Sequence, residues 1–382
     1  MKFQRGRALA LAIASTLLIA ACGSGSGSAG GTTDPATISS TIETSVATSP
    51  AAVASTGPAD TASPDTTEPT PEPSAATTVD TDPPASDPVS SGPLTIQQLL
   101  DLGRPIVLAH AAGEDQFPHS SPYGYGESVK AGVDMLDFDV QLTGDGVLVI
   151  QHDDSTGRTA DQDLVVADST YEQLHALDNA YSFTAGCVCT DAAPEAYIYR
   201  GIRTGAVQPP AGYTADDFAI ARFSDVAKRF SDYPVNIEIK GEGEPAIAAA
   251  RELATELAEL DLLDNAVVAS FDDAVVTAFH EFAPTVEISP GLGASSAWVL
   301  DSTPLPDGMR ILQLPPKFGE IDVLSPDTMT KTHAAGYFVW VWPNDRTLEN
   351  PASYQQLLTE GMDGLNINFP GAGVEAVRTF AG

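Results

Sequence analysis

Short apolar runs, rich in β-branched and aromatic residues, recur along the C-terminal part of this chain and predict strands. The runs are RPIVLAH, VDMLDFDVQL, GVLVIQH, YPVNIEIK, NAVVASF, PTVEIS, MRILQL, GYFVWVW and MDGLNINF. Segments with helical spacing lie between several of them. In EPAIAAARELATELAEL, apolar residues from Ile247 to Leu257 fall on one face. SFDDAVVTAFHEFAP predicts a second helix that begins near Asp272 or Asp273 and ends before a proline.

The alternation of strands and helices predicts an α/β fold with a parallel sheet. Eight or nine such units over this length favour a (β/α)8 TIM barrel over an open doubly wound sheet. Two stretches do not follow the alternation: residues 155–221, which contain CVC and AYIYRGIRTG, and residues 291–309. We expect both to be insertions or long loops.

The N-terminus is typical of an export signal. Residues 1–22 combine a basic start, the apolar stretch ALALAIASTLLIAA and Cys22, and the stretch is too short to span a bilayer comfortably. The ending IAACG resembles the lipobox of bacterial lipoproteins, whose cysteine becomes the lipid-modified N-terminus. We therefore expect an exported protein, anchored through Cys22 at the outer face of the cell membrane. The alternative is an ordinary signal peptide that is cleaved nearby.

Residues 23–92 consist mainly of Thr, Pro, Ser, Ala, Gly and Asp, and no Lys or Arg occurs between Arg7 and Arg104. Such a segment has few large apolar groups to offset the entropy of ordering it. It predicts a disordered acidic tether, which leaves residues 93–382 as one large domain.

Charge and cysteine content narrow the possible partners. A formal net charge of −34, from 52 acidic and 18 basic residues, argues against nucleic-acid binding. No feature of the sequence indicates a protein partner. Besides Cys22, only Cys187 and Cys189 are present, and in an exported protein they could form a local disulfide, bind a soft metal or stay as free thiols.

Four of the apolar runs end in polar side chains that lie on a definite face of their strand. These side chains are His110, Asp137 with Asp139, His152, and Glu238 with Lys240. Side chains alternate along a strand, so Asp137 and Asp139 share a face with Met135. In a β/α barrel the carboxyl ends of the strands form the mouth where loops build active sites.

This inventory of side chains suits one kind of chemistry. Three carboxylates suit a hard divalent ion such as Ca2+ or Mg2+, and the chain lacks the Cys/His spacing of structural zinc sites. Two histidines suit a general base and a general acid, and a lysine suits a phosphate oxygen. Metal-assisted phosphodiester cleavage is the leading hypothesis.

Several blocks also resemble a known family. LAHAAG, GVDMLDFDVQLTGDGVLVIQHDDSTGRT, VNIEIK, ASFDD, VWVWPND and GMDGLNINFP are similar, in order, to the signature blocks of the glycerophosphodiester phosphodiesterases. The resemblance runs from about Arg104 to the C-terminus. It implies a (β/α)8 barrel that uses a divalent ion to cleave glycerophosphodiesters into glycerol phosphate and an alcohol.

The resemblance also implies roles for individual residues. The substrate's own glycerol hydroxyl is the expected nucleophile, and sequence does not assign base and acid between the two histidines. The implied positions are His110 and His152 for catalysis, Asp137, Asp139 and Glu238 for the metal, and Lys240 for the phosphate.

The chain departs from the family pattern at several positions. Where the family has His-Arg-Gly, this chain has His110-Ala111-Ala112, so an arginine that would touch phosphate is missing. Arg158 or Arg200 could compensate, or phosphate affinity could be lower. Three further changes have less direct consequences: His119 replaces a glutamate, Asp137 replaces a glutamate, and Asn368 replaces an aspartate. His119 is either a polar group of the site or a loop histidine.

Two other functions compete with this prediction. Sphingomyelinase D-like enzymes share the barrel and a site of two histidines with metal-binding carboxylates. Candidates for a choline-phospholipid pocket in this chain are Trp340, Trp342 and Tyr337. The other competitor is a non-catalytic lipoprotein that binds phosphorylated ligands. The TGDG and EIK blocks favour the glycerophosphodiester reaction over the first competitor. Retention of both histidines and all three carboxylates argues against the second.

Overall fold

The computed structural model describes residues 93–382. The predicted lipoprotein signal peptide (1–22), with Cys22, and the predicted linker (23–92) lie outside the described residues. In the part of the chain that is described, no helix is both long and apolar enough to cross a membrane.

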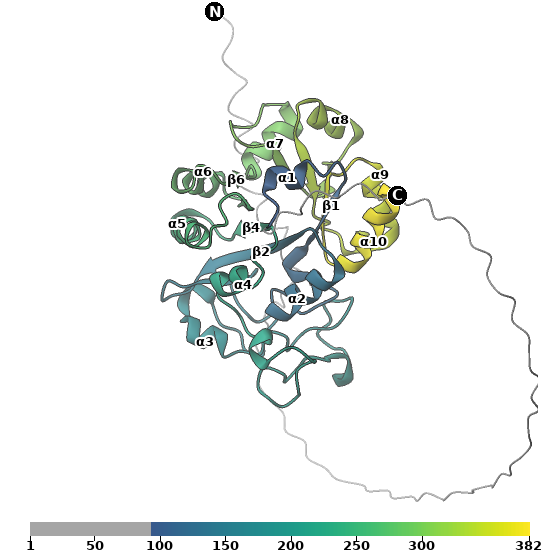
Figure 1. Cartoon of the computed structure of the whole chain (residues 1–382). Helices are drawn as coiled ribbons and strands as arrows, with labels where there is room; N and C mark the ends of the chain where they lie inside the picture. Colours follow the sequence, from purple (N-terminus) through teal and green to yellow (C-terminus); the bar gives the residue numbers. More distant parts are fainter. Residues whose placement is uncertain (1–92) are drawn as a thin grey trace, which may run out of the picture. The chain divides into compact units, whose positions relative to one another are not determined.

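Eight parallel strands form a nearly closed barrel, which confirms the predicted (β/α)8 architecture (Figure 1). The barrel strands are β1 (Ile106–Ala109), β2 (Met135–Leu142), β4 (Val235–Ile239), β5 (Ala266–Ala269), β6 (Glu287–Ile288), β7 (Ile311–Leu314), β10 (Phe338–Val341) and β11 (Gly364–Ile367). Their order is β6-β5-β4-β2-β1-β11-β10-β7. A parallel bridge between Ile288 and Met309 brings the β6 and β7 edges together.

The run GVLVIQH is not a ninth barrel strand. It forms β3 (Leu148–Ile150), which pairs antiparallel with β2 so that Val140 lies opposite Ile150. Residues 143–147 form a tight turn, in which the Gly146 N–H donates to the Thr143 carbonyl. A parallel crossover needs about a dozen residues or more, so this short connection permits only a hairpin. A second hairpin, β8 (Lys317–Phe318) with β9 (Ile321–Asp322), follows β7.

Helices surround the strands (Figure 1). They are α1 (Ile96–Leu100), α2 (Pro122–Ala131), α3 (Tyr171–His175), α4 (Phe223–Arg229), α5 (Gly243–Glu259), α6 (Asp273–Phe282), α7 (Leu292–Asp301), α8 (Pro326–Ala334), α9 (Pro351–Thr359) and α10 (Pro370–Ala381). Both helices predicted from apolar spacing are present, as α5 and α6. The Asp272 carboxylate accepts the Ala274 N–H at 2.8 Å and so caps the start of α6.

The expectation of an insertion or long loop at residues 291–309 is wrong for the first part of that range, where α7 forms. Trp298 of α7 is buried, and its indole N–H donates to the Thr332 hydroxyl of α8 at 2.9 Å. The sequence of α7, LGASSAWVLD, contains glycine and two serines, which are weaker helix formers than alanine or leucine. Tertiary packing of the tryptophan therefore contributes more to this helix than local propensity does.

Residues 155–221 contribute no barrel strand. They contain α3 and the short 3-10 helices η3 (Val166–Asp168), η4 (Pro194–Ala196) and η5 (Ala215–Phe218). Aromatic rings join this segment to α2, because Tyr123 stacks on Phe218 with 4.7 Å between ring centroids and also contacts Tyr199. Cys187 and Cys189 form a disulfide with each other. The structure therefore contains the local disulfide, and not a soft-metal site or two free thiols.

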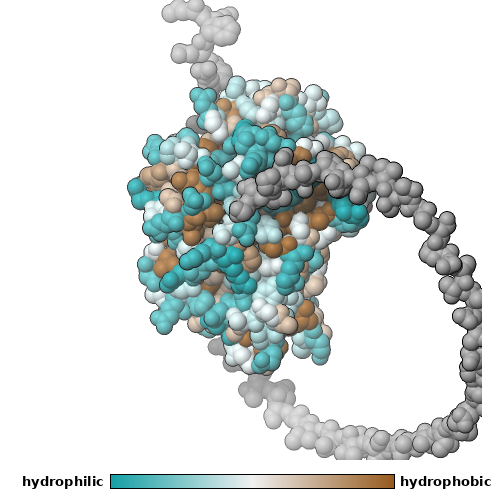
Figure 2. All heavy atoms as spheres, in the orientation of Figure 1, coloured by the Kyte–Doolittle hydropathy of each residue, from teal (hydrophilic) through white to brown (hydrophobic). Residues whose placement is uncertain are grey.

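Apolar layers lie on both sides of the barrel strands. The interior layer includes Leu108, Met135, Ile311 and Trp340, and the outer layer joins the strands to the helices. Met135 shares its face of β2 with two aspartates, so this face begins apolar and becomes polar toward the carboxyl end of the strand. On the face of the molecule that Figure 2 shows, hydrophilic residues are interspersed with smaller hydrophobic areas.

Candidate active site

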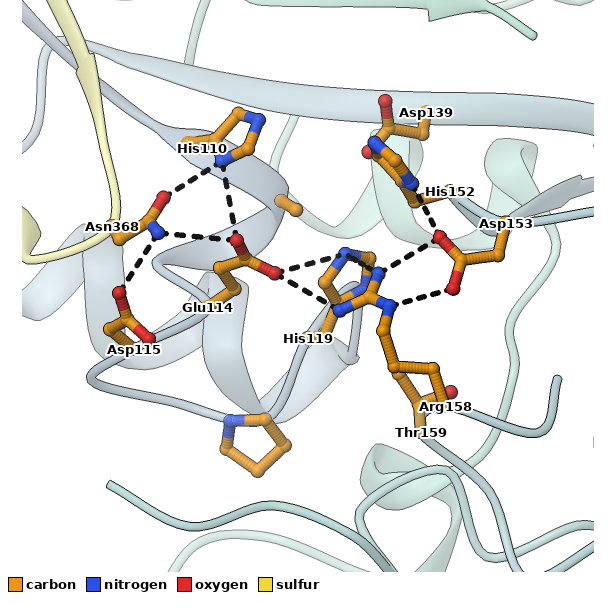
Figure 3. Close-up of polar contacts among 12 residues, drawn as sticks. His110, Glu114, Asp115, His119, Asp139, His152, Asp153, Arg158, Thr159 and Asn368 are labelled. Atoms are coloured by element: carbon orange, nitrogen blue, oxygen red, sulfur yellow. Dashed lines mark hydrogen bonds and ion pairs between the residues drawn. The ribbon is translucent and has the colours of Figure 1, made fainter. Parts of the chain in front are cut away.

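Most of the predicted site residues lie at the carboxyl ends of neighbouring strands. They are His110 after β1, Asp137 and Asp139 in β2, and Glu238 and Lys240 in and directly after β4. Strand β2 lies between β1 and β4, so the sheet order brings these side chains to one part of the barrel mouth. His152 reaches the same place from the β2–β3 hairpin and lies beside Asp139 in Figure 3.

Asp139 and Glu238 form a carboxylate pair that shares one lysine. They are register partners on β2 and β4, and the Lys240 ammonium lies 3.0 Å from a carboxylate oxygen of each. Burial opposes ionisation of Asp139, but Lys240 and the nearby histidines hold the pKa of this carboxyl well below its usual range. The two carboxylates raise the pKa of Lys240 against the opposite effect of burial. Asp139 and Lys240 are therefore both charged at neutral pH.

Asp137 is held by neutral donors. The Asn236 amide donates to its Oδ1 at 2.6 Å, and the Ala111 N–H donates to its Oδ2 at 3.3 Å. Asn236 is in turn hydrogen-bonded to Gln313 of β7, which continues to the Ser289 hydroxyl. Burial raises the pKa of Asp137, and the charge of nearby Asp139 adds to this effect. A polar layer thus crosses the barrel interior just below the mouth.

The carboxylates do not form a ready-made coordination cage. Within residues 93–382, no group of three or more His, Cys, Asp or Glu side chains is arranged to hold a metal ion. The chemistry of the site nevertheless fits a hard cation, because Asp139 Oδ2 is buried with no hydrogen-bond partner. The Lys240 ammonium supplies the positive charge between Asp139 and Glu238.

An amide holds His110. The His110 Nδ1 lies 2.8 Å from the Asn368 Oδ1, and the Asn368 Nδ2 donates to Glu114 at 3.1 Å and to Asp115 at 2.9 Å. Carboxylates can only accept, so the amide oxygen must face the imidazole and His110 Nδ1 carries the hydrogen. Burial acts to lower the pKa of His110, but the charges of Glu114 and the β2 aspartates outweigh it and raise this pKa.

A carboxylate holds His152. Its Nδ1 lies 2.6 Å from Asp153 Oδ1, and Arg158 donates to both oxygens of the same carboxylate. The Gln141 side-chain amide bridges the carbonyls of three consecutive residues, Gln151 to Asp153, and so fixes the backbone that carries the ring. The imidazole is therefore oriented through both its side chain and its main chain.

His119 belongs to the site rather than to a free loop. It is buried, its ring meets that of His152 edge to face at 5.8 Å, and its Nε2 lies 3.1 Å from Arg158 Nη2. Burial and the Arg158 charge lower the pKa of His119 to about 3. His119 is thus neutral at pH 7 and accepts a hydrogen bond from Arg158.

Glu114, which sequence reasoning missed, connects the two halves of the site (Figure 3). One carboxylate oxygen accepts from Asn368 and lies 3.5 Å from Arg346 Nη1, and the other accepts from Arg158 at 3.2 Å. Burial would raise the pKa of Glu114, but the surrounding basic side chains lower it to about 2. These side chains are His119, His110, Arg158 and Arg346. Glu114 therefore holds groups on the His110 side and on the His152 side together.

Some of the other missed residues could have been identified from the sequence pattern, and some could not. Gln141 lies in phase with Asp137 and Asp139 on β2, so the alternating polar pattern could have identified it. Glu114 and Arg346 lie in loops, where no periodicity predicts which side chains converge. Asn236 also lay within an apolar run, where one polar residue could have been noticed.

Some candidates lie elsewhere or have other roles. Arg200 stacks over Tyr181 and Tyr197 within residues 155–221, so it does not replace the missing arginine of the first block. Trp340 is buried in the barrel interior and Tyr337 packs on a helix, so neither lines a substrate pocket. Trp342 is half-buried beyond the end of β10, with its ring 5.9 Å from that of exposed Phe271.

Comparison with known proteins agrees with this geometry. A model of the glycerophosphoryl diester phosphodiesterase family matches residues 110–372, which is more than half of the chain. The chain belongs to this family. It is therefore a phosphoric diester hydrolase.

Relatives of this family match most of the described region. A glycerophosphodiester phosphodiesterase from Bacillus altitudinis is 23% identical over 273 residues, covering 70% of this chain and 96% of the relative. A glycerophosphoryl diester phosphodiesterase domain from Mycobacterium tuberculosis has a similar structure, with TM-score 0.56 and 16% identity, covering 71% of this chain and 98% of that one. A phosphodiesterase from Oleispira antarctica, solved with the product sn-glycerol-3-phosphate, matches with TM-score 0.52 and 18% identity over 73% of this chain and 99% of that one.

The lowered pKa of Glu114 predicts an acid-sensitive contribution to stability. The ordinary value is 4.5 and the folded value is about 2, so the unfolded chain takes up the proton first as the pH falls. The stabilisation is complete above about pH 4.5 and is lost toward pH 2. Glu114→Gln should therefore lower the free energy of unfolding by up to about 3 kcal/mol at pH 7.

Urea denaturation at several pH values measures this effect. The difference in the free energy of unfolding between wild type and Glu114→Gln should shrink by roughly 1.4 kcal/mol per pH unit below pH 4.5. Glu281→Gln, on the exposed side of α6, is the control and should show little gap at any pH. A gap for Glu114→Gln that does not change with pH would contradict the assignment.

Proposed function

We propose that the protein hydrolyses glycerophosphodiesters to glycerol phosphate and an alcohol, with a divalent metal ion and two histidines. The observation that carries the proposal is the pair of oriented imidazoles, His110 and His152, beside the two carboxylates that share Lys240. Membership of the family supports the substrate class.

Family members generally depend on a divalent metal ion. In this chain Asp137, Asp139 and Glu238 would hold it, because they are the carboxylates at the mouth that face the barrel axis. The ion, Ca2+ or Mg2+, would supply positive charge for the phosphoryl oxygens when bound. Lys240 lies between two of these carboxylates, and the third N–H of its ammonium would be its donor to the same phosphate.

The partners of the two imidazoles suggest their separate roles. A neutral amide, Asn368, holds the Nδ1–H of His110 and leaves Nε2 free to accept a proton from the glycerol hydroxyl that attacks phosphorus. The Asp153 carboxylate orients His152 through Nδ1, and we assign to this second imidazole the protonation of the leaving alcohol. Water then opens the cyclic phosphate, and glycerol phosphate is released.

Release of glycerol phosphate from glycerophosphocholine, glycerophosphoethanolamine and glycerophosphoinositol tests the function. We expect turnover that a chelator abolishes and that either Ca2+ or Mg2+ restores. Asp139→Asn should lower kcat about a hundredfold or more, and Asp322→Asn in the exposed β8–β9 hairpin should not.

Other outcomes of the same assay would indicate the competing functions. Turnover of sphingomyelin or lysophosphatidylcholine instead would point to the phospholipid phosphodiesterase alternative, which the Phe271–Trp342 pair at the mouth would suit. Binding of sn-glycerol-3-phosphate without turnover of any diester would point to the non-catalytic lipoprotein.

A substrate with an acidic leaving group separates the roles of the histidines. p-Nitrophenol needs no protonation to leave, so His152→Ala should regain most of its activity on the p-nitrophenyl ester of glycerol phosphate. On glycerophosphocholine the same variant should lose about a hundredfold or more in kcat. His110→Ala should be impaired on both substrates. His333→Ala, in α8, is the control, and equal losses by both histidine variants on both substrates would contradict the assignment.

We also propose that the domain works outside the cell membrane, anchored through a lipid on Cys22. The lipobox-like ending of residues 1–22 supports this proposal. In a bacterial host, wild-type protein should incorporate labelled palmitate and fractionate with membranes, and Cys22→Ser should do neither. Finding unlabelled wild-type protein in the cytosol would contradict the anchor.

A further inference from the structure

The phosphate site of this chain lacks one expected cation. Where the family has arginine, Ala111 is fully buried and its N–H contacts Asp137. Among residues 93–382, three cationic side chains form ion pairs with the acids of this site: Lys240, Arg158 and Arg346. A phosphodiester anion must approach past several carboxylates, so it matters which of these cations can still form new bonds.

Two of the three are already engaged with protein groups. Lys240 lies between two carboxylates at 3.0 Å from each. Arg158 donates to both oxygens of Asp153, to Glu114 and to His119, so four of its contacts are made inside the site. Moving Arg158 toward a ligand would break the ion pair that orients His152.

Arg346 is held differently. It opens η6 (Arg346–Leu348), beyond the end of β10, and its side chain is 41% exposed. It contacts Asp115, which is only 2% exposed, and lies 3.5 Å from Glu114 in a looser ion pair. The same two acids accept the amide of Asn368, the residue that holds His110. The guanidinium is therefore placed next to the His110 side of the mouth, with donors still open to solvent.

We infer that Arg346 binds a phosphoryl oxygen of the substrate and takes the place of the missing first-block arginine. The inference rests on the proposed function and adds a substrate-binding residue to it. A planar guanidinium can bind one carboxylate and one phosphate oxygen at the same time. Asp115 and Glu114 act as positioning residues, because they hold Arg346 while leaving its exposed edge free.

The test compares Arg346→Ala with wild type in the full protein. We expect KM for glycerophosphocholine, and the inhibition constant of sn-glycerol-3-phosphate, to rise about tenfold to a hundredfold. Arg346→Lys should recover part of the loss because it keeps the charge without the planar fork. Arg378→Ala, an exposed arginine of α10, is the control and should match wild type.

A merely structural role for Arg346 makes a different prediction. If Arg346 only neutralises Asp115, adding Asp115→Asn to Arg346→Ala should restore KM, whereas loss of a phosphate ligand should not be restored. Wild-type KM and inhibition constant in Arg346→Ala would overturn the inference and leave the proposed function intact. If wild type turns over no diester, calorimetric titration with sn-glycerol-3-phosphate still tests Arg346. Weaker binding by Arg346→Ala would then support the inference while the proposed function fails.

Discussion

Burial of two aspartates on one face of β2 is the constraint on which the rest of this site depends. Asp137 and Asp139 are both almost inaccessible, and two like charges in a low-dielectric interior are costly unless each is compensated. Lys240 compensates Asp139, and the neutral Asn236 amide and a backbone N–H compensate Asp137. Asp139 keeps one oxygen without a partner, which is the property a cation site requires.

The compensation of charge extends outward into the loops. Glu114 lies outside the barrel strands, yet it accepts hydrogen bonds from both Asn368 and Arg158. Asn368 contacts His110, and Arg158 pairs with the carboxylate that holds His152. Ala111 and Ala112 adopt positive φ values of 44° and 72°, which alanine rarely does, and this turn directs the Ala111 N–H to Asp137. The strained backbone of this turn thus donates one hydrogen bond to a buried carboxylate.

Errors at the level of elements have a common cause. The run of β3 has the composition of a barrel strand, but its short connection makes it a hairpin partner of β2. The sequence of α7 has weak helical spacing, but burial of Trp298 between helices supports a helix there. In both cases a constraint from outside the segment decided the structure.

The sequence by itself determined the strand and helix alternation, the barrel, and the polar groups at the carboxyl ends of β1, β2 and β4. This succeeded because side-chain alternation and the geometry of parallel strands are local properties. Only the tertiary structure decided that Glu114, Asn368 and Arg346 meet, because they lie in separate loops whose paths depend on the packing of the whole barrel. For the same reason, only the tertiary structure decided that His119 lies in the site and Arg200 outside it.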